Sequence, residues 1–313
     1  MDVTFAAEEY FASIKRLETG TRQGYEQRLG VFADWCAGQG ICLEQVSRRI
    51  VDSFVEHLYA THTGAKGTPL SSHTTTGYVR VIRAWLYWCL DDEQFSEYVK
   101  LTVIRRIRLP KLTQKIIQVY TQEHIDALIR AARREYNDYL QERDITIIKL
   151  LLCTGIRAAE LCTLKIADCH LKPNTLRNPS DNYIRVMGKG KKEREIPLDE
   201  ATRRELARFI RQHRAGVKPG AVVFVGRTES ARMTVDGLES MLRRLADWAG
   251  IEDDQVRVSP HTFRHTYAAR FILNGGSIYH LSRLLGHSSV QTSEKYLASI
   301  SGLQIRKSLE QQS

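Results

Sequence analysis

Four residues near the carboxyl-terminal end supply the groups needed for attack on a phosphodiester. His261 and Arg264 stand three residues apart, His287 follows Leu285-Gly286, and Tyr296 lies nine residues further on. In such an attack the non-bridging oxygens gain negative charge and a sugar oxygen departs. A nucleophile, fixed cations and a proton donor are therefore required. A tyrosine phenol can form a covalent intermediate, so the spacing predicts phosphoryl transfer with two histidines as proton handlers.

Two further residues that could act on a phosphodiester lie earlier in the chain. Arg157 follows Thr154-Gly155 at the expected start of a helix, and Lys189 stands between two glycines in Gly188-Lys189-Gly190-Lys191. A guanidinium is planar, permanently charged and matched to two phosphate oxygens, which an ammonium cannot reproduce. We therefore expect Arg157 and Arg264 to clamp the phosphate.

In type, order and spacing, six residues resemble those of the tyrosine recombinases, the integrase family of site-specific DNA recombinases. They are Arg157, Lys189, His261, Arg264, His287 and Tyr296. One short motif would be only a hypothesis, but six in order form a specific signal. The resemblance implies that Tyr296 forms a 3′-phosphotyrosyl bond, that Lys189 protonates the departing 5′ oxygen and that Glu160 supports Arg157. The covalent bond would store the phosphodiester energy, so neither ATP nor a metal is needed.

Several of these residues also have an ordinary structural interpretation. Tyr296 is one of 13 tyrosines, Arg157 and Glu160 could form a routine helical ion pair, and Lys189 could be a solvated hairpin lysine. Lys191 or Lys192, in or beside the same turn, could supply the acid instead.

A zinc site is a further alternative, because His261 and His265 are four residues apart. Arg264 stands between them, however, where it would repel a cation, and no glutamate there could act as a base. We assign His265 a structural role. No cluster of acidic residues indicates a magnesium site, and we predict no metal and no cofactor.

The charge is concentrated in the second part of the chain. The 313 residues carry 46 Lys and Arg against 36 Asp and Glu, a net charge of +10. Residues 1–110 hold 13 basic and 13 acidic side chains, whereas residues 111–313 hold 33 and 23. This excess favours a polyanionic partner, nucleic acid first, although a basic protein without one is the simpler alternative.

A basic stretch joins two patterned regions around Pro110. It contains no acidic residue between positions 105 and 115, and it could either follow a phosphate backbone or serve as a solvated strap. The residues expected to contact DNA are Arg105, Arg106, Arg108, Lys111, Lys115, Lys191 and Lys192.

The length favours two domains. Apolar stripes in residues 25–35, 50–58 and 79–90 predict a bundle of four or five helices over 1–108, with Trp35, Trp85 and Trp88 in its core. A basic linker is predicted over 109–118 and a catalytic domain with a tail over 119–313. The fold class is thus an all-α helical bundle followed by a mixed α+β domain, and the resemblance identifies the bundle as the family's SAM-like core-binding domain.

The second region alternates helices with short strands. We predict a helix capped by Thr121, a buried helix over 145–153 that ends at Gly155, and a β-hairpin formed by 183–186 and 195–197. Further helices are expected at 199–214, 234–249, the His261–Arg264 segment and 278–285, and a short strand at 221–225.

Six cysteines without CxxC pairing do not indicate a disulfide framework. The start of the chain lacks a signal sequence, and no apolar run is long enough to span a membrane. We therefore expect a cytoplasmic protein. Residues 297–313 form a short segment that either docks onto a neighbouring protomer, as is common in the family, or is a frayed end.

The resemblance implies a C-shaped clamp on double-stranded DNA, a dimer on each recombination site and a tetramer in the synapse. A partner recombinase or an accessory protein is compatible with this assembly. Because few residues precede the first expected helix of the bundle, we expect no additional arm-binding domain, and this expectation favours a Xer-like recombinase. The alternatives are an integrase, resolvase or transposase of a mobile element, a type IB topoisomerase, and a non-catalytic DNA-binding protein.

Overall fold

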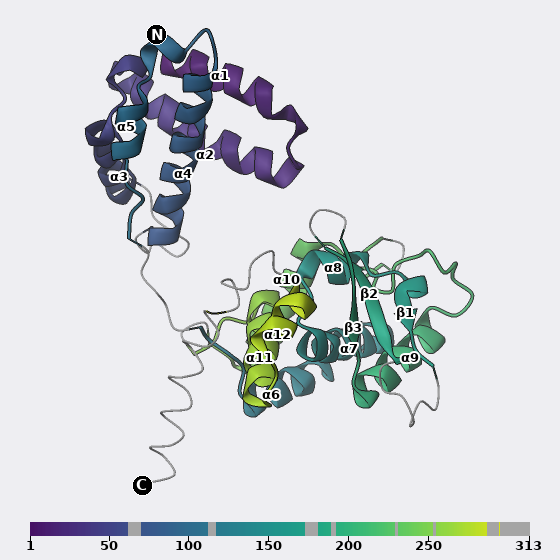
Figure 1. Ribbon diagram of the computed structural model, residues 1–313. Coiled ribbons are helices and arrows are strands. Elements are labelled where there is room, and N and C mark those ends of the chain that lie inside the picture. The colour runs from purple at the N-terminus through teal and green to yellow at the C-terminus, as the bar shows by residue number, and fades with distance from the viewer. Residues whose placement is uncertain are drawn as a thin grey trace. The chain divides into compact units, whose positions relative to one another are not determined.

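The computed structural model describes residues 1–61, 70–111, 117–172, 181–188, 192–228, 231–252, 255–286 and 294. The chain divides into two compact units, unit 1 (Met1–Lys115) and unit 2 (Ile116–Ser313). Figure 1 labels the elements of both. No helix in these ranges is long and apolar enough to cross a membrane.

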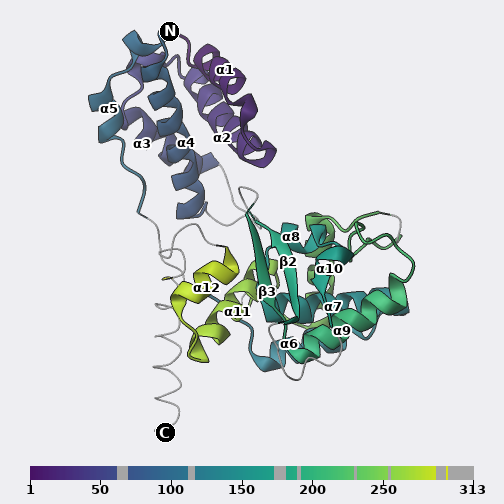
Figure 2. The same cartoon turned by 45° about the vertical axis from the view of Figure 1, so that its right-hand side comes forward.

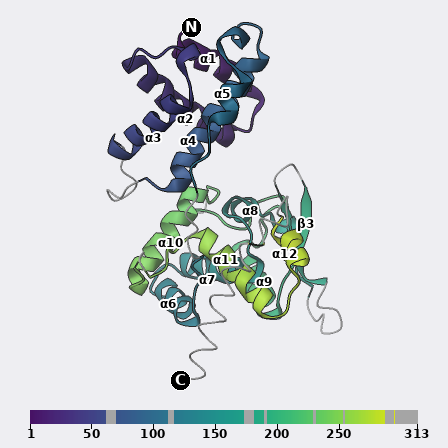
Figure 3. The same ribbon diagram turned by 60° about the vertical axis from the view of Figure 1, so that its left-hand side comes forward.

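Unit 1 consists of α-helices and short 3-10 turns wherever it is described. Its helices are α1 (Val3–Ser13), α2 (Thr19–Gly38), α3 (Arg48–Thr61), α4 (Ser72–Asp91) and α5 (Leu101–Arg106). The three predicted stripes lie in α2, α3 and α4 and are confirmed. Figure 3 shows these helices packed side by side.

Aromatic side chains fill the core of unit 1. Phe32 is fully buried and meets Phe54 edge-on, with their ring centroids 5.0 Å apart. Trp85 is fully buried and its indole Nε1 donates to the Ala6 carbonyl at 3.2 Å. Trp35 and Trp88 pack against the same core, so the prediction that these tryptophans are core residues is confirmed.

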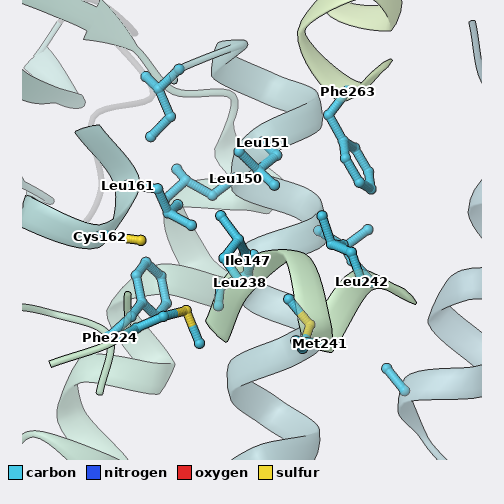
Figure 4. Packing of buried hydrophobic residues seen from close by; sticks show 14 of the residues in the cluster. Ile147, Leu150, Leu151, Leu161, Cys162, Phe224, Leu238, Met241, Leu242 and Phe263 are labelled. Carbon is cyan, nitrogen blue, oxygen red and sulfur yellow. The ribbon is translucent and has the colours of Figure 1, made fainter. Parts of the chain in front are cut away.

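Unit 2 surrounds a central helix, α7 (Asp138–Thr154). This helix contacts α6 (Gln122–Ala132), α9 (Glu200–His213) and α11 (Pro260–Leu273). Figure 4 shows its apolar side chains meeting those of α8 (Ala158–Thr163), α10 (Val235–Ala249) and α11. The last described helix is α12 (Ile278–Leu285).

A small antiparallel sheet completes unit 2. Its strands are β1 (Cys169–His170), β2 (Tyr183–Met187) and β3 (Glu193–Pro197), in the order β1-β2-β3. The β2–β3 register pairs Tyr183 with Pro197 and Met187 with Glu193, and Figure 2 shows the two strands side by side. The predicted hairpin strands are confirmed, and its turn, residues 189–191, lies outside the described residues.

Local capping explains where the helices of unit 2 begin and end. The Thr121 hydroxyl accepts from the His124 amide at the start of α6, as predicted. Gly155 ends α7 with φ of 59°, a left-handed conformation that glycine adopts without strain. The predicted helices at 199–214, 234–249 and 278–285 are also confirmed.

One prediction in unit 2 is wrong. Residues 221–225 do not form a strand, since only isolated bridges link Lys165 with Val222 and Val225 with Arg232. The apolar run is explained by burial instead: Val223 and Phe224 are fully buried in the core. A continuous apolar segment fits a buried irregular segment as well as it fits a strand.

Candidate active site

The end of α7 determines where Arg157 lies. A Cβ atom at Gly155 would stand 2.6 Å from Cδ1 of Tyr267, so the close packing of α11 excludes any larger residue. The chain turns there and places Arg157 immediately before the first residue of α8, in extended conformation. Gly155 therefore ends α7, and Arg157 occupies the N-cap position of α8.

Glu160 anchors Arg157 twice. One carboxylate oxygen accepts from the Arg157 backbone amide at 2.8 Å, and the other accepts from Nη1 of its guanidinium at 2.9 Å. Burial would raise the pKa of this carboxyl, but hydrogen bonds from Arg194 and Arg157 hold it below its ordinary value. Glu160 is therefore a charged, buried support for the arginine.

Arg264 enters the site from α11. The neighbouring Phe263 is fully buried in the core of unit 2 and fixes this helix. Arg264 is itself buried, and its guanidinium donates to the Gly155 carbonyl at 2.9 Å and to the Leu285 carbonyl at 2.7 Å. These contacts tie the end of α7, helix α11 and the end of α12 together.

Three arginines converge on the last carbonyls of α12. Arg194 Nε donates to the Leu284 carbonyl, Arg264 Nη2 to that of Leu285 and Arg157 Nη2 to that of Gly286, at distances of 2.7, 2.7 and 2.8 Å. A helix carboxyl end carries partial negative charge and exposes unsatisfied carbonyls, so guanidiniums stabilise it. Gly286 ends the helix with φ of 64°.

His261 lies on the first turn of α11 and is exposed. Partial desolvation of the imidazole lowers its pKa, the charges of Arg264, Arg157 and Arg257 lower it further, and Glu239 opposes them. The neutral ring is therefore favoured near neutral pH, where it can accept a proton. His261 and His265 have ring centroids 6.4 Å apart, and in the described parts of the chain they have no third histidine, cysteine or carboxylate to form a metal site.

The structure brings together Arg157, Glu160 and Arg264, with His261 within electrostatic range of both arginines. The other expected site residues, Lys189, His287 and Tyr296, lie outside the described residues, as do Lys115 and Lys191. Lys192, Lys111, Arg105, Arg106 and Arg108 are exposed.

Sequence reasoning missed Arg194. It grips Glu160 through both terminal nitrogens, at 2.9 and 2.7 Å, and only 11% of its side chain is exposed. The signal was present in the alternation of β3, because Arg194 is in phase with the fully buried Ile196. A charged residue on the buried face of a strand requires a buried partner.

A comparison with known proteins identifies the family of this chain. Residues 118–301, more than half of the chain, match the phage integrase family. The chain belongs to this family. The resemblance to tyrosine recombinases found in the sequence is thereby confirmed.

Curated relatives span nearly the whole chain. The tyrosine recombinase XerD of Pseudomonas aeruginosa is 28% identical over 286 residues, which cover 90% of this chain and 87% of the relative. A tyrosine recombinase of Pseudothermotoga lettingae is 26% identical over 296 residues, with 92% and 91% covered. The chain is therefore similar to tyrosine recombinases along most of its length.

Solved structures share the fold. The post-cleavage complex of XerH site-specific recombinase with palindromic difH substrate matches with a TM-score of 0.75 at 18% identity, over 97% of this chain and 84% of that one. The Tn1549 transposon integrase in complex with a circular intermediate DNA matches with a TM-score of 0.73 at 18% identity, over the whole of both chains.

Proposed function

We propose that this family member is a site-specific DNA recombinase that cuts and rejoins DNA through a covalent bond to Tyr296. The observation that carries the proposal is the convergence of Arg157 and Arg264 on the adjacent carbonyls of Gly286 and Leu285. Consecutive Cα atoms are only about 3.8 Å apart, so both cations are held at neighbouring residues, and His287 is the next residue in the sequence. Phosphoryl transfer needs such a preorganised positive site.

In the proposed reaction, Arg157 and Arg264 hold the non-bridging oxygens of the scissile phosphate. The Tyr296 oxygen bonds to phosphorus as it loses its proton to a neighbouring base, and the bond from phosphorus to the 5′ oxygen breaks. Lys189 donates a proton to that oxygen, while His261 and His287 donate hydrogen bonds to the phosphate oxygens or accept the tyrosine proton. The 5′ hydroxyl of the partner strand then reverses these steps. No ATP or metal takes part.

The proposed domain roles follow from charge and exposure. Residues 1–108 form a helical DNA-binding domain, 109–118 a basic linker and 119–313 the catalytic domain. Exposed Arg105, Arg106, Arg108, Lys111 and Lys192, together with Lys115 and Lys191, contact phosphates of the duplex. Two copies occupy each site and four form the synapse. Related structures contain DNA, difH substrate with XerH and a circular intermediate DNA with the Tn1549 integrase, which supports duplex DNA as the partner.

A Xer-like role is the first candidate because of the similarity to XerD proteins over most of both chains. A mobile-element integrase is the second. The specific observation in its favour is the match to the Tn1549 transposon integrase, with a TM-score of 0.73 against 0.75 for XerH.

The decisive experiment uses duplexes selected from a random pool for binding to the protein. These sites are cloned once or twice into a supercoiled plasmid. A recombinase resolves the two-site plasmid into two circles and leaves the one-site plasmid supercoiled. Relaxation of both plasmids without exchange would identify a type IB topoisomerase and overturn the proposal. Binding without any covalent complex would identify a non-catalytic protein.

The acid is assigned by a second experiment. Without a proton donor an alkoxide leaves poorly, so Lys189→Ala should cleave about 10²- to 10⁴-fold more slowly than the unaltered protein. Replacing the bridging 5′ oxygen with sulfur removes this need, because a thiolate departs unprotonated, and should restore cleavage. An equal defect on both substrates would instead direct attention to Lys191 and Lys192.

A further inference from the structure

Arg194 links the β-hairpin to two other segments of unit 2. Its Nη1 and Nη2 donate to the two oxygens of Glu160, and its Nε donates to the Leu284 carbonyl. The pairing with Glu160 is the parallel, two-point geometry in which a guanidinium binds a carboxylate most strongly. One side chain of β3 thereby fixes both α8 and the end of α12.

Two glycines leave room for the guanidinium of Arg194. A Cβ atom at Gly286 would lie 3.0 Å from Nη1 of Arg194, and one at Gly188 would lie 3.2 Å from the same atom. Two glycines of the family motifs thus border one arginine. A lysine in its place has a single ammonium and cannot present the same planar fork.

Glu160 is shared between Arg194 and Arg157. Its side chain is only 5% exposed, whereas that of Arg157 is 35% exposed and thus partly open to a ligand. A buried carboxylate that loses one cation must be satisfied by the other, at a considerable cost. Without Arg194, Glu160 would therefore depend on its hydrogen bonds with Arg157 for a positive partner.

We propose that Arg194 is a positioning residue for the phosphate clamp, acting through Glu160 and the Leu284 carbonyl to hold Arg157 and the end of α12 in their reactive arrangement. This assignment rests on the proposed function, because it concerns the same cleavage step. Among the described residues, Arg194 donates to Glu160 and to the Leu284 carbonyl, and it acts on the phosphate through Arg157.

The test compares Arg194→Lys with Arg185→Lys. Arg185 lies on the neighbouring strand of the same hairpin, and its ion pair with Glu195 is exposed, at 37% and 55%. We expect Arg194→Lys to lower the cleavage rate constant at saturating protein by about 10- to 100-fold, since small misplacements of a reacting group have effects of this size. The Kd for intact DNA should change less than about threefold, and Arg185→Lys should cleave normally.

Two further readouts separate positioning from a merely structural role. The defect of Arg194→Lys should be equal on oxygen-bridged and sulfur-bridged DNA, because the clamp and not the acid is affected. Combining it with Glu160→Gln should slow cleavage no further than the slower single variant, since both changes break one unit. Melting curves identify any variant that is not folded at the assay temperature. Arg194→Gln is measured in parallel as a second substitution at the same position.

Three results would overturn the assignment: cleavage by folded Arg194 variants as fast as by Arg185→Lys, rescue by sulfur, or defects that multiply in the double variant. An absence of covalent complex in the unaltered protein would overturn the proposed function instead, so the two failures are distinguishable.

Discussion

The two units handle charge in opposite ways. Within the described ranges, the buried polar side chains of unit 1 are Thr75 and Thr76, and its core is apolar and aromatic. Among the residues that the structure describes, the buried charged side chains lie in unit 2: Arg143, Asp144, Glu160, Arg203 and Arg264. Burying a charge costs free energy unless the charge is paired. Unit 2 has this cost, which the described core of unit 1 avoids.

Four of these five residues form ion pairs, and the fifth, Arg264, donates to backbone carbonyls. Asp144 is fully buried and accepts from Arg143 at 2.7 Å and from Arg244 at 2.7 Å. The exposed arginines at the end of α5 belong to unit 1. Combined with the proposed function, this contrast leads us to propose that exposed cations set DNA affinity, whereas the cations held inside unit 2 set the cleavage rate.

The largest free-energy change is expected in the core of unit 1. Phe32→Ala should lower the free energy of unfolding of this unit by about 3–5 kcal/mol, because a fully buried ring leaves a cavity. Urea unfolding followed by tryptophan fluorescence measures it. A Trp248→Phe background restricts the signal to the three tryptophans of unit 1. A loss below about 1 kcal/mol would show that the aromatic core is not what stabilises unit 1.

The next largest effect is expected at Arg264. Arg264→Lys should slow cleavage by about 10²- to 10³-fold, because one ammonium cannot replace the fork that stabilises developing charge. The Kd for DNA should stay nearly constant. Single-turnover formation of covalent complex measures the rate, and a titration of labelled duplex measures the Kd. A large loss of affinity with an unchanged rate would reverse the proposed division of work.

A smaller effect is expected at the exposed arginines. Replacing Arg105, Arg106 and Arg108 by glutamine should make the slope of log K against log[salt] less steep by up to about three, since each lost phosphate contact accounts for nearly one. The matched control replaces the equally exposed Arg16, Arg48 and Arg49. Equal slopes for the two triple variants would make residues 105–111 a strap rather than a contact surface.

No effect is expected from chelation. Cleavage should be the same with and without excess EDTA, because Arg157 and Arg264 provide the positive charge at the phosphate. Loss of covalent complex on chelation, with recovery on addition of Zn²⁺ or Mg²⁺, would revive the alternative in which His261 and His265 bind a metal.

Local sequence patterns predicted much of the fold, but they did not predict contacts between residues far apart in the sequence. The cap at Thr121, the stop at Gly155 and the bounds of α12 follow from neighbouring residues, and the structure has all three. The alternation of β3 indicates that Arg194 is buried, but its partners Glu160 and Leu284 lie 34 and 90 residues away, so no local pattern identifies them. Residues 221–225 were misassigned because burial alone does not specify a strand.

The most direct test of the account concerns Tyr296. The measurement is the amount of protein trapped on a nicked suicide substrate, from which the released fragment diffuses away and prevents religation. We predict that Tyr296→Phe binds this duplex with an affinity close to that of the unaltered protein, because phosphate contacts dominate affinity, and forms no covalent complex. Covalent trapping of Tyr296→Phe at the level of the unaltered protein would contradict the central claim.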